Sequence, residues 1–347
     1  MGRARTLAQV YRHFGEGEAA GTLYARVAVA VSESAEALRA VEAAPARKRQ
    51  PALILAALHD LALAGRAPAL AAAYAARDGD AAAAAAIDAL LYETELVVAL
   101  AAHRKARKGE TGRCAVLYPA IAEAAHRVGA DAVGLVDVGC SAGLNLTVDR
   151  VGITYDNGQS LGDPSSPVRH AAGVVGDRRL PAHAMPDVRT RVGIDAEPVD
   201  VTDPEQARWV RACLPPEEVA GLDAELALAA ADPPVLLRGD VVDLLPEAIA
   251  RVPDDVLPVV TTTWALRRLS LEHRLRFLRR LDEAATHRPV AWVSAEGVGV
   301  APAIPTFGDR HASGHSIIGL AVFEHATLRA EGVGRTWSQG RLLSWLA

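Results

Sequence analysis

The sequence predicts an α/β fold in which a helical N-terminal part precedes a parallel β-sheet. Three observations predict it. Residues 1–127 show helical spacing of apolar side chains, strand-like and helix-like runs alternate after Ala130, and a Gly-rich turn follows the first strand-like run. Strands that alternate with helices are typical of βαβ units and a parallel sheet. We therefore expect a helical N-terminal domain over residues 1–127, serving as a lid or substrate domain, and an α/β domain over residues 128–347.

In the N-terminal part, apolar periodicity predicts helices and no strand before residue 130. Large apolar residues lie at helical spacing over residues 53–64, and Pro51 stands where the first helical turn tolerates a missing N–H group. Two further helices are expected over about residues 81–106 and 114–128.

In the α/β part, five strand-like runs and a closing antiparallel pair are expected. A short helical turn is expected over residues 144–150, and residues 150–187, rich in Gly, Pro and Asp, look like an insertion between the first and second strands. The expected strands span residues 132–139, 188–195, 234–242, 256–264 and 289–297, and the pair spans residues 317–332 and 335–346.

Composition excludes several classes of protein. The formal charge is -5 and the pI about 6.1, so no nucleic-acid partner is expected. Three cysteines without C-x-x-C spacing predict neither a disulfide framework nor a zinc site, and His311 and His315 lack a third ligand. Residues 1–21 lack the apolar run of a signal peptide, and no stretch of about 20 apolar residues occurs. We therefore expect a cytoplasmic protein without a membrane partner.

The most informative stretch is the turn after the first strand, Val136 to Leu146, read as VDVGCSAGLNL. Small residues are needed where a backbone approaches a ligand closely after a strand. This turn resembles motif I of class I S-adenosylmethionine-dependent methyltransferases, D/E-x-G-x-G-x-G. Asp137, Gly139 and Gly143 match the motif, and Ser141 replaces its middle glycine. With Asn145, these residues are the expected cofactor-binding turn.

The resemblance implies a Rossmann-like, class I methyltransferase-type sheet with S-adenosylmethionine as cofactor. Asp195 ends the second strand, where the family has an acid that accepts the ribose hydroxyls, and Asp240 follows the third strand, like the family's acid beside the adenine. Asp195 lies 52 residues after Gly143 instead of about 20, so the insertion must absorb the difference. Asp163 has the ordinary spacing but follows no clear strand.

Most of residues 1–300 also resembles the DUF2332 family, actinobacterial proteins of uncharacterised function. That resemblance implies a helical N-terminal part joined to a methyltransferase-like domain and no particular reaction. The segments that carry it are RKRQPALILAALHDL (47–61), ETGRCA (110–115), VDVGCSAGLN (136–145), GDPSSPV (162–168), GIDAEPVDVTD (193–203) and RGD (238–240).

Further candidates lie at the ends of strands and of a charged run. Thr263 and Trp264 end the fourth strand, which faces the reacting methyl group in methyltransferases, and Glu296 ends the fifth strand as a candidate general base. Arg113 closes the charged run 103–113 and would hold a carboxylate of the cofactor or of an acidic substrate, as would Arg104. The alternative reading of this run is a solvated helix end.

Methyl transfer to a small-molecule acceptor is the expected reaction, and three alternatives stay open. A helical lid that excludes acceptors would let the cofactor's own amino group attack its chain, which gives cyclisation. The turn also spells G-x-S-x-G, the nucleophile elbow of α/β-hydrolases, with Ser141 as nucleophile and Asp240 and His315 as partners. A protein that only binds a ligand is the third alternative.

Overall fold

The computed structural model describes residues 5–107 and 111–347. The chain forms two compact units. The helical unit comprises Met1–Gly109 with Thr202–Asp223, and the sheet unit comprises Glu110–Val201 with Ala224–Ala347. The division differs from the expected boundary at residue 127 in two ways: the helix that ends at Val128 belongs to the sheet unit, and a later segment belongs to the helical unit.

The helical unit begins its helices at residues that suit a helix N-terminus. Thr6, Thr22, Ser34 and Asp78 each accept a backbone N–H of the following turn through their side chains. The expected helix over 81–106 is two helices that meet at Glu93. The unit contains α1 (Leu7–Glu16), α2 (Leu23–Glu33), α3 (Ala35–Glu42), α4 (Pro51–Leu63), α5 (Pro68–Ala76), α6 (Gly79–Tyr92), α7 (Thr94–His103) and α9 (Pro204–Ala212).

Helix α4 is the centre of this unit. Eleven of its 13 residues are buried, among them the polar His59 and Asp60. His59 Nδ1 lies 3.0 Å from the Tyr24 hydroxyl and 3.2 Å from the Leu214 carbonyl oxygen, and Arg208 Nε donates to Asp60 at 3.0 Å. The segment around α9 therefore supplies the partners of the buried polar groups of α4.

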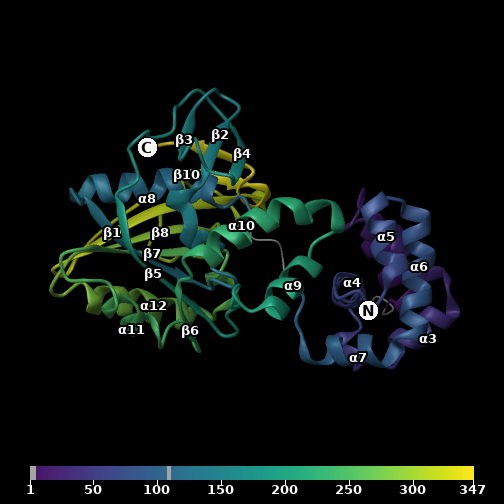
Figure 1. Cartoon of the computed structure of the whole chain (residues 1–347). Coiled ribbons are helices and arrows are strands. Elements are labelled where there is room, and N and C mark those ends of the chain that lie inside the picture. Colours follow the sequence, from purple (N-terminus) through teal and green to yellow (C-terminus); the bar gives the residue numbers. More distant parts are fainter. Residues whose placement is uncertain (1–4, 108–110) are drawn as a thin grey trace. The chain divides into compact units, whose positions relative to one another are not determined.

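The sheet unit is built on one mixed sheet of 11 strands, in the order β3-β2-β4-β11-β10-β9-β8-β7-β1-β5-β6. Five neighbours, β6-β5-β1-β7-β8, are mutually parallel, and β9 and β10 continue the sheet antiparallel (Figure 1). The strands are β1 (Ala132–Val138), β2 (Gly152–Tyr155), β3 (Ser160–Gly162), β4 (Arg169–Val174), β5 (Asp187–Asp195), β6 (Val235–Arg238), β7 (Leu257–Thr263), β8 (Val290–Gly297), β9 (Ser316–Glu324), β10 (Thr327–Trp337) and β11 (Leu342–Trp345).

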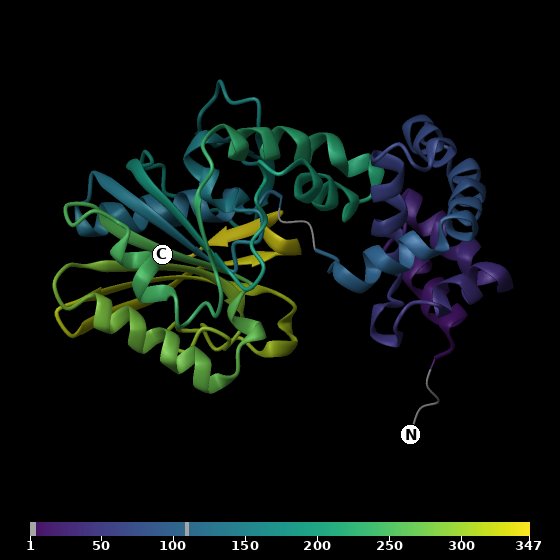
Figure 2. The same ribbon diagram turned by 60° about the horizontal axis from the view of Figure 1, so that its bottom comes forward.

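Helices cover both faces of the parallel strands, as Figure 2 shows for α8 on one side and α11 and α12 on the other. Alternate side chains of β1 enter the two cores: Leu135 packs with α8, and Val136 packs with α11 and α12. Burial on both faces explains the nearly continuous apolar sequence of these strands. The helices are α8 (Cys114–Val128), α11 (Leu245–Ala250) and α12 (Leu271–Ala284), and α10 (Val219–Ala231) begins in the helical unit and ends in the sheet unit.

The expected insertion forms strands of the same sheet. β2 pairs antiparallel with β3 and parallel with β4, and β4 pairs parallel with β11. The third parallel strand is shorter than expected, because β6 ends at Arg238 and the chain turns at Gly239 and Asp240. The protein is thus an α/β protein with a mixed sheet.

No single helix of residues 5–107 and 111–347 is long and apolar enough to cross a membrane. Helices α4 and α5 reach that length and apolarity only together, across a bend of 99°.

Candidate functional site

The turn after β1 contains three residues in the left-handed backbone region. Gly139 and Gly143 have φ of +76° and +71°, which glycine adopts without strain. Ser141 has φ of +50°, which costs a residue with a Cβ atom about 1–2 kcal/mol. Strain of this kind gathers at functional sites, so the turn is a candidate site on geometric grounds.

The N–H groups of this turn bond within the protein. Gly139 N and Cys140 N donate to the Ile194 carbonyl oxygen at 2.8 and 3.2 Å, and Ser141 N donates to Asp195 Oδ2 at 3.1 Å. The close packing of the turn on β5 requires Gly193, because a Cβ atom there would lie 2.6 Å from Cys140 Sγ. These three N–H groups are therefore used within the protein, and the expected close approach of this turn to a cofactor stays a prediction.

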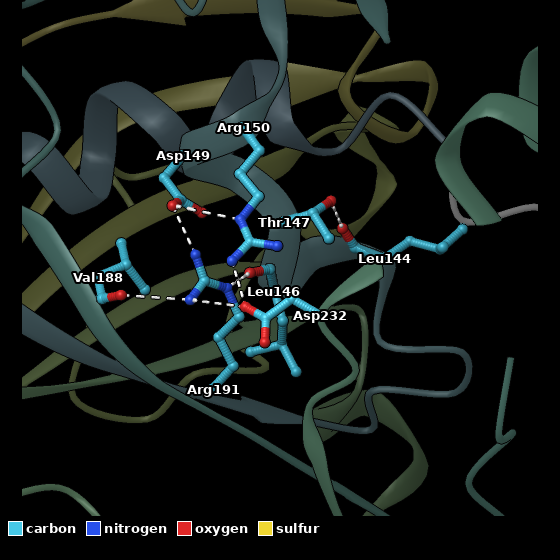
Figure 3. Close-up of polar contacts among 8 residues, drawn as sticks. All are labelled: Leu144, Leu146, Thr147, Asp149, Arg150, Val188, Arg191 and Asp232. Carbon is cyan, nitrogen blue, oxygen red and sulfur yellow. Dashed lines mark hydrogen bonds and ion pairs between the residues drawn. The ribbon is translucent and has the colours of Figure 1, made fainter. Parts of the chain in front are cut away.

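The segment after the turn is a 3-10 helix, η2 (Leu144–Arg150), where the sequence predicts a short helical turn. Arg191 of β5 holds it in place (Figure 3): Nε donates to the Leu146 carbonyl oxygen at 2.9 Å and Nη2 donates to Asp149 Oδ2 at 2.6 Å. Arg150, at the end of η2, pairs with Asp232. This set of contacts fixes the segment that carries Asn145 against the parallel sheet.

A buried polar cluster lies at the carboxyl ends of β1 and β7. Asp137 is 1% exposed; its Oδ1 accepts the Thr261 hydroxyl at 2.7 Å and its Oδ2 accepts Asn145 Nδ2 at 3.1 Å. Burial raises the pKa of Asp137 to about 6, while the hydrogen bonds from Thr261 and Asn145 and the charge of Arg113 lower it. A buried carboxyl group whose pKa lies near neutral pH, at the edge of a sheet, is a candidate anchor for a polar or cationic ligand group.

The amide of Asn145 has a fixed orientation. Its Nδ2 donates both to Asp137 Oδ2 and to Thr263 Oγ1, the latter at 3.2 Å, so a reversed amide would place two oxygens together. Its Oδ1 is buried and has no hydrogen-bond partner among the described residues. A buried acceptor without a partner is costly, and a ligand with an N–H or O–H group would relieve that cost.

Arg113 joins this cluster from the residue before α8. Its Nη1 donates to Thr263 Oγ1 at 3.1 Å, and its guanidinium carbon lies 5.2 Å from the centre of the Trp264 ring. Trp264 has φ of +55°, and its Nε1 donates to Ser316 Oγ at 2.9 Å. The structure thus brings together five of the predicted site residues, Asp137, Asn145, Thr263, Trp264 and Arg113.

The rest of the charged run is described in part. Lys108, Gly109 and Glu110 lie outside the described residues. Arg104 belongs to the helical unit, where its guanidinium carbon lies 5.7 Å from the centre of the Trp209 ring.

Residues 8–345 match the model of a family described as an uncharacterized protein conserved in bacteria, DUF2332. The chain belongs to the DUF2332 family. No curated protein and no solved structure matches this DUF2332 chain significantly, so the site must be interpreted from its own geometry.

The acid that ends β5 and the acid that follows β6 in this DUF2332 protein both accept backbone N–H groups. Asp195 accepts Ser141 N through Oδ2 and Glu197 N through Oδ1 at 2.8 Å. Asp240 Oδ1 accepts Val242 N at 2.9 Å and Asp243 N at 3.1 Å. Each carboxylate oxygen keeps a further lone pair, so the expected contacts with a ribose and an adenine stay predictions.

Glu296 lies on the other face of the sheet from Asp137. Side chains alternate along β8, so Ala295 faces the core under α8, whereas Glu296 shares its face with Trp292. Glu296 Oε1 accepts the N–H groups of Ala265 and Leu266 at 2.9 and 3.0 Å, and burial raises its pKa to about 7. Its predicted role as a general base stays a prediction. Its Oε2 is buried and has no hydrogen-bond partner within residues 5–107 and 111–347.

Asp240 and His315, the expected partners of Ser141 in a hydrolase, each bond to other groups. Asp240 bonds the turn after β6, whereas His315 Nε2 lies 2.8 Å from Asp309 Oδ2, which also accepts Arg335 Nε at 2.7 Å. Within the described ranges, no three His, Cys, Asp or Glu side chains are placed to hold a metal ion.

The contacts of two residues of the DUF2332 site were not predicted from the sequence. Thr261 fixes the Asp137 carboxylate, and the alternation that places Thr261 and Thr263 on one face of β7 was a usable signal. Arg191 holds η2, and nothing local in the sequence points to it, because its partners come from segments distant in the chain.

Proposed function

We propose that this DUF2332 protein binds S-adenosylmethionine at the carboxyl edge of β1, β5 and β7 and transfers its methyl group to a small-molecule acceptor. The observation that carries the proposal is the buried acceptor Oδ1 of Asn145, fixed beside the Asp137 carboxylate directly after a Gly-rich turn. An acceptor beside a carboxylate suits an ammonium group, such as the amino group of the cofactor.

The place in the sheet supports the same proposal. The parallel strands follow the order β6-β5-β1-β7-β8, which is 3-2-1-4-5 in chain order, so the topology reverses between β1 and β7. Ligands of open α/β sheets bind outside the carboxyl ends of the strands at this reversal. Asp137 and Thr261, paired in register across it, lie at those ends. We infer a methyltransferase-type sheet from this order and from the antiparallel β9 beside β8.

The residues of the cluster would divide the binding between them. Asn145 and Asp137 would take the ammonium group, and the Arg113 guanidinium would take the carboxylate. Asp195 and Asp240 would accept hydroxyl and amino hydrogens through their second lone pairs. Bound S-adenosylmethionine supplies an electrophilic methyl group, so the protein has to hold an acceptor in line beside Thr263 and Trp264 and exclude water.

Calorimetric titration of the whole chain with S-adenosylmethionine and S-adenosylhomocysteine tests the proposal. Asn145→Ala should weaken both affinities by about tenfold or more, the value of one hydrogen bond to a charged group. Asn157→Ala, an exposed asparagine of the β2–β3 turn, is the matched control and should bind as the wild type. No binding of either ligand at millimolar concentration would overturn the proposal.

Mass spectrometry of the incubated mixture separates the reactions. Methyl transfer to an added acceptor yields S-adenosylhomocysteine and a methylated acceptor. Cyclisation needs no acceptor, and its products all come from S-adenosylmethionine. The strained Ser141 favours one competing function, because nucleophile elbows place their serine on such a turn. Labelling by a serine-directed phosphonate that Ser141→Ala abolishes would support the hydrolase instead.

A further inference from the structure

Trp264 is held in a backbone conformation that tryptophan rarely adopts. Its φ of +55° lies in the left-handed region, where a Cβ atom crowds the backbone. Such a residue persists only where surrounding contacts over-determine it. Two of these contacts are its own: Trp264 N donates to the Ala295 carbonyl oxygen at 3.0 Å, and its Nε1 donates to Ser316 Oγ at 2.9 Å.

Glu296 supplies the next two contacts. Its Oε1 accepts the N–H groups of Ala265 and Leu266, the two residues directly after Trp264, at 2.9 and 3.0 Å. Glu296 is 1% exposed, and hydrogen bonds to a buried carboxylate are strong. Arg267 and Arg274 provide positive charge around it from η4 (Leu266–Arg268) and α12.

Trp264 in turn supports Arg113. The Arg113 guanidinium lies over the Trp264 ring and donates to Thr263 Oγ1. Glu296 faces away from the cluster around Asp137, and the turn that contains Trp264 connects the two. An unbroken series of contacts therefore leads from Glu296 through Trp264 to Arg113.

We propose that Glu296 is a positioning residue, which fixes Trp264 in its left-handed conformation and thereby keeps Arg113 over the Trp264 ring and hydrogen-bonded to Thr263. The consequence for cofactor affinity rests on the proposed function, since Arg113 would hold the cofactor carboxylate. The consequence for Trp264 does not rest on it and can be measured without any ligand.

The indole N–H signal of Trp264, assigned by Trp264→Phe in spectra of ¹⁵N-labelled whole chain, tests the first consequence. Glu296→Gln keeps the accepting oxygen and should leave the signal near its wild-type position. Glu296→Asp keeps the charge, is one methylene too short to reach both N–H groups, and should shift and broaden the signal. Ser294→Ala is the matched control, because Ser294 is fully buried on the same face of β8. An unchanged signal in Glu296→Asp would overturn the proposal, as would an equal change in Ser294→Ala.

A double-mutant cycle tests the second consequence. Glu296→Asp should weaken S-adenosylhomocysteine binding about fivefold or more when Arg113 is present and less than about twofold in an Arg113→Ala background, since coupled residues are not additive. Equal losses in both backgrounds would refute the route through Arg113. If the wild type does not bind this ligand, the proposed function fails, and the indole signal alone decides on Glu296.

The rate at which the whole chain consumes S-adenosylmethionine separates a positioning role of Glu296 from a role in proton transfer. Glu296→Gln should keep most of the wild-type turnover, because its accepting oxygen remains. A loss of about a hundredfold or more would identify Glu296 as the general base and overturn the proposal.

Discussion

The Oδ1 atom of Asp137 accepts the Thr261 hydroxyl at 2.7 Å, between residues that pair directly in the parallel register of β1 and β7. The pair is buried, so its hydrogen bond holds a carboxylate in a place that penalises charge. Burial raises the pKa of Asp137 to about 6. The native protein therefore keeps a proton on Asp137 at a pH at which the unfolded chain has released it.

This difference predicts that Asp137→Asn stabilises the protein at neutral pH. The native state binds more protons than the unfolded state between about pH 4 and pH 6, so the wild type loses stability as the pH rises through this window. The loss should reach about 3 kcal/mol, and Asp137→Asn removes it. Urea unfolding at pH 4.5 and 7.5 measures it, with the exposed Asp254→Asn as the control that should follow the wild type. If the difference in the free energy of unfolding between Asp137→Asn and the wild type does not increase from pH 4.5 to pH 7.5, Asp137 is not the group with the raised pKa.

Arg191→Leu should destabilise the protein by about 3 kcal/mol, because it removes the hydrogen bonds to the Leu146 carbonyl and the Asp149 carboxylate and leaves that carboxylate the 4.0 Å ion pair with Arg150 Nε. Arg189, two residues earlier on β5, provides the control. Its ion pairs with Asp187 and Asp255 are exposed, and Arg189→Leu should change the free energy of unfolding by less than about 1 kcal/mol. Denaturant midpoints of the two variants make the comparison. Equal losses would show that the Arg191 contacts are not worth more than surface pairs.

His59 predicts the opposite pH dependence in the helical unit. Burial lowers its pKa to about 4, so the unfolded chain binds a proton between about pH 6.5 and pH 4 that the native state refuses. Stability conferred by neutral His59 is present above pH 6.5 and is lost as the pH falls, by about 3 kcal/mol in all. Unfolding curves of His59→Gln should lack this part of the loss, whereas those of the exposed His13→Gln should follow the wild type. If the free energy of unfolding depends on pH in the same way for His59→Gln and the wild type, the prediction is wrong.

Gly193→Ala should destabilise the sheet unit by about 1–3 kcal/mol through overpacking, because its Cβ atom would meet Cys140 Sγ at 2.6 Å. Gly221→Ala is the control on helix α10. No atom lies within 4 Å of its added Cβ, so alanine should raise stability by about 1 kcal/mol. Thermal unfolding of both variants checks the contrast, and a neutral Gly193→Ala would mean that the turn moves freely on β5.

Much of the parallel sheet was predictable, because strands buried on both faces have a nearly continuous apolar sequence. The runs predicted at 132–139, 256–264 and 289–297 correspond to β1, β7 and β8, and the helix predicted at 114–128 is α8. Asp137 and Asn145 were predictable as members of one turn, since they are near in the chain. The connection of Asn145 to Arg113 through Thr263 Oγ1 required the fold, which brings the start of α8 to the end of β7.

Contacts between distant segments account for what the sequence did not predict. The pairing register of β1, β7 and β8 decides whether Glu296 faces Asp137, and the pattern of a single strand does not contain that register. The 3-10 geometry of η2 depends on Arg191, which comes more than 40 residues later. The boundary at residue 127 was expected because the helical pattern of the sequence ends there. Helix α8 is nevertheless apolar enough to cover a sheet face, and it belongs to the sheet unit.

The chain leaves the helical unit at Gly109 and returns to it at Thr202, and this has a consequence for biosynthesis. His59 and Tyr24 emerge from the ribosome early, but the carbonyl groups that they bond, of Leu214 and Ala212, are made only after most of the first half of the sheet unit. The helical unit therefore completes its core late, with a partly synthesised sheet already attached. A fragment that stops before residue 202 would expose the buried face of α4. The helical unit therefore needs the later segment of the chain to complete its core, and the two units are not exchangeable modules.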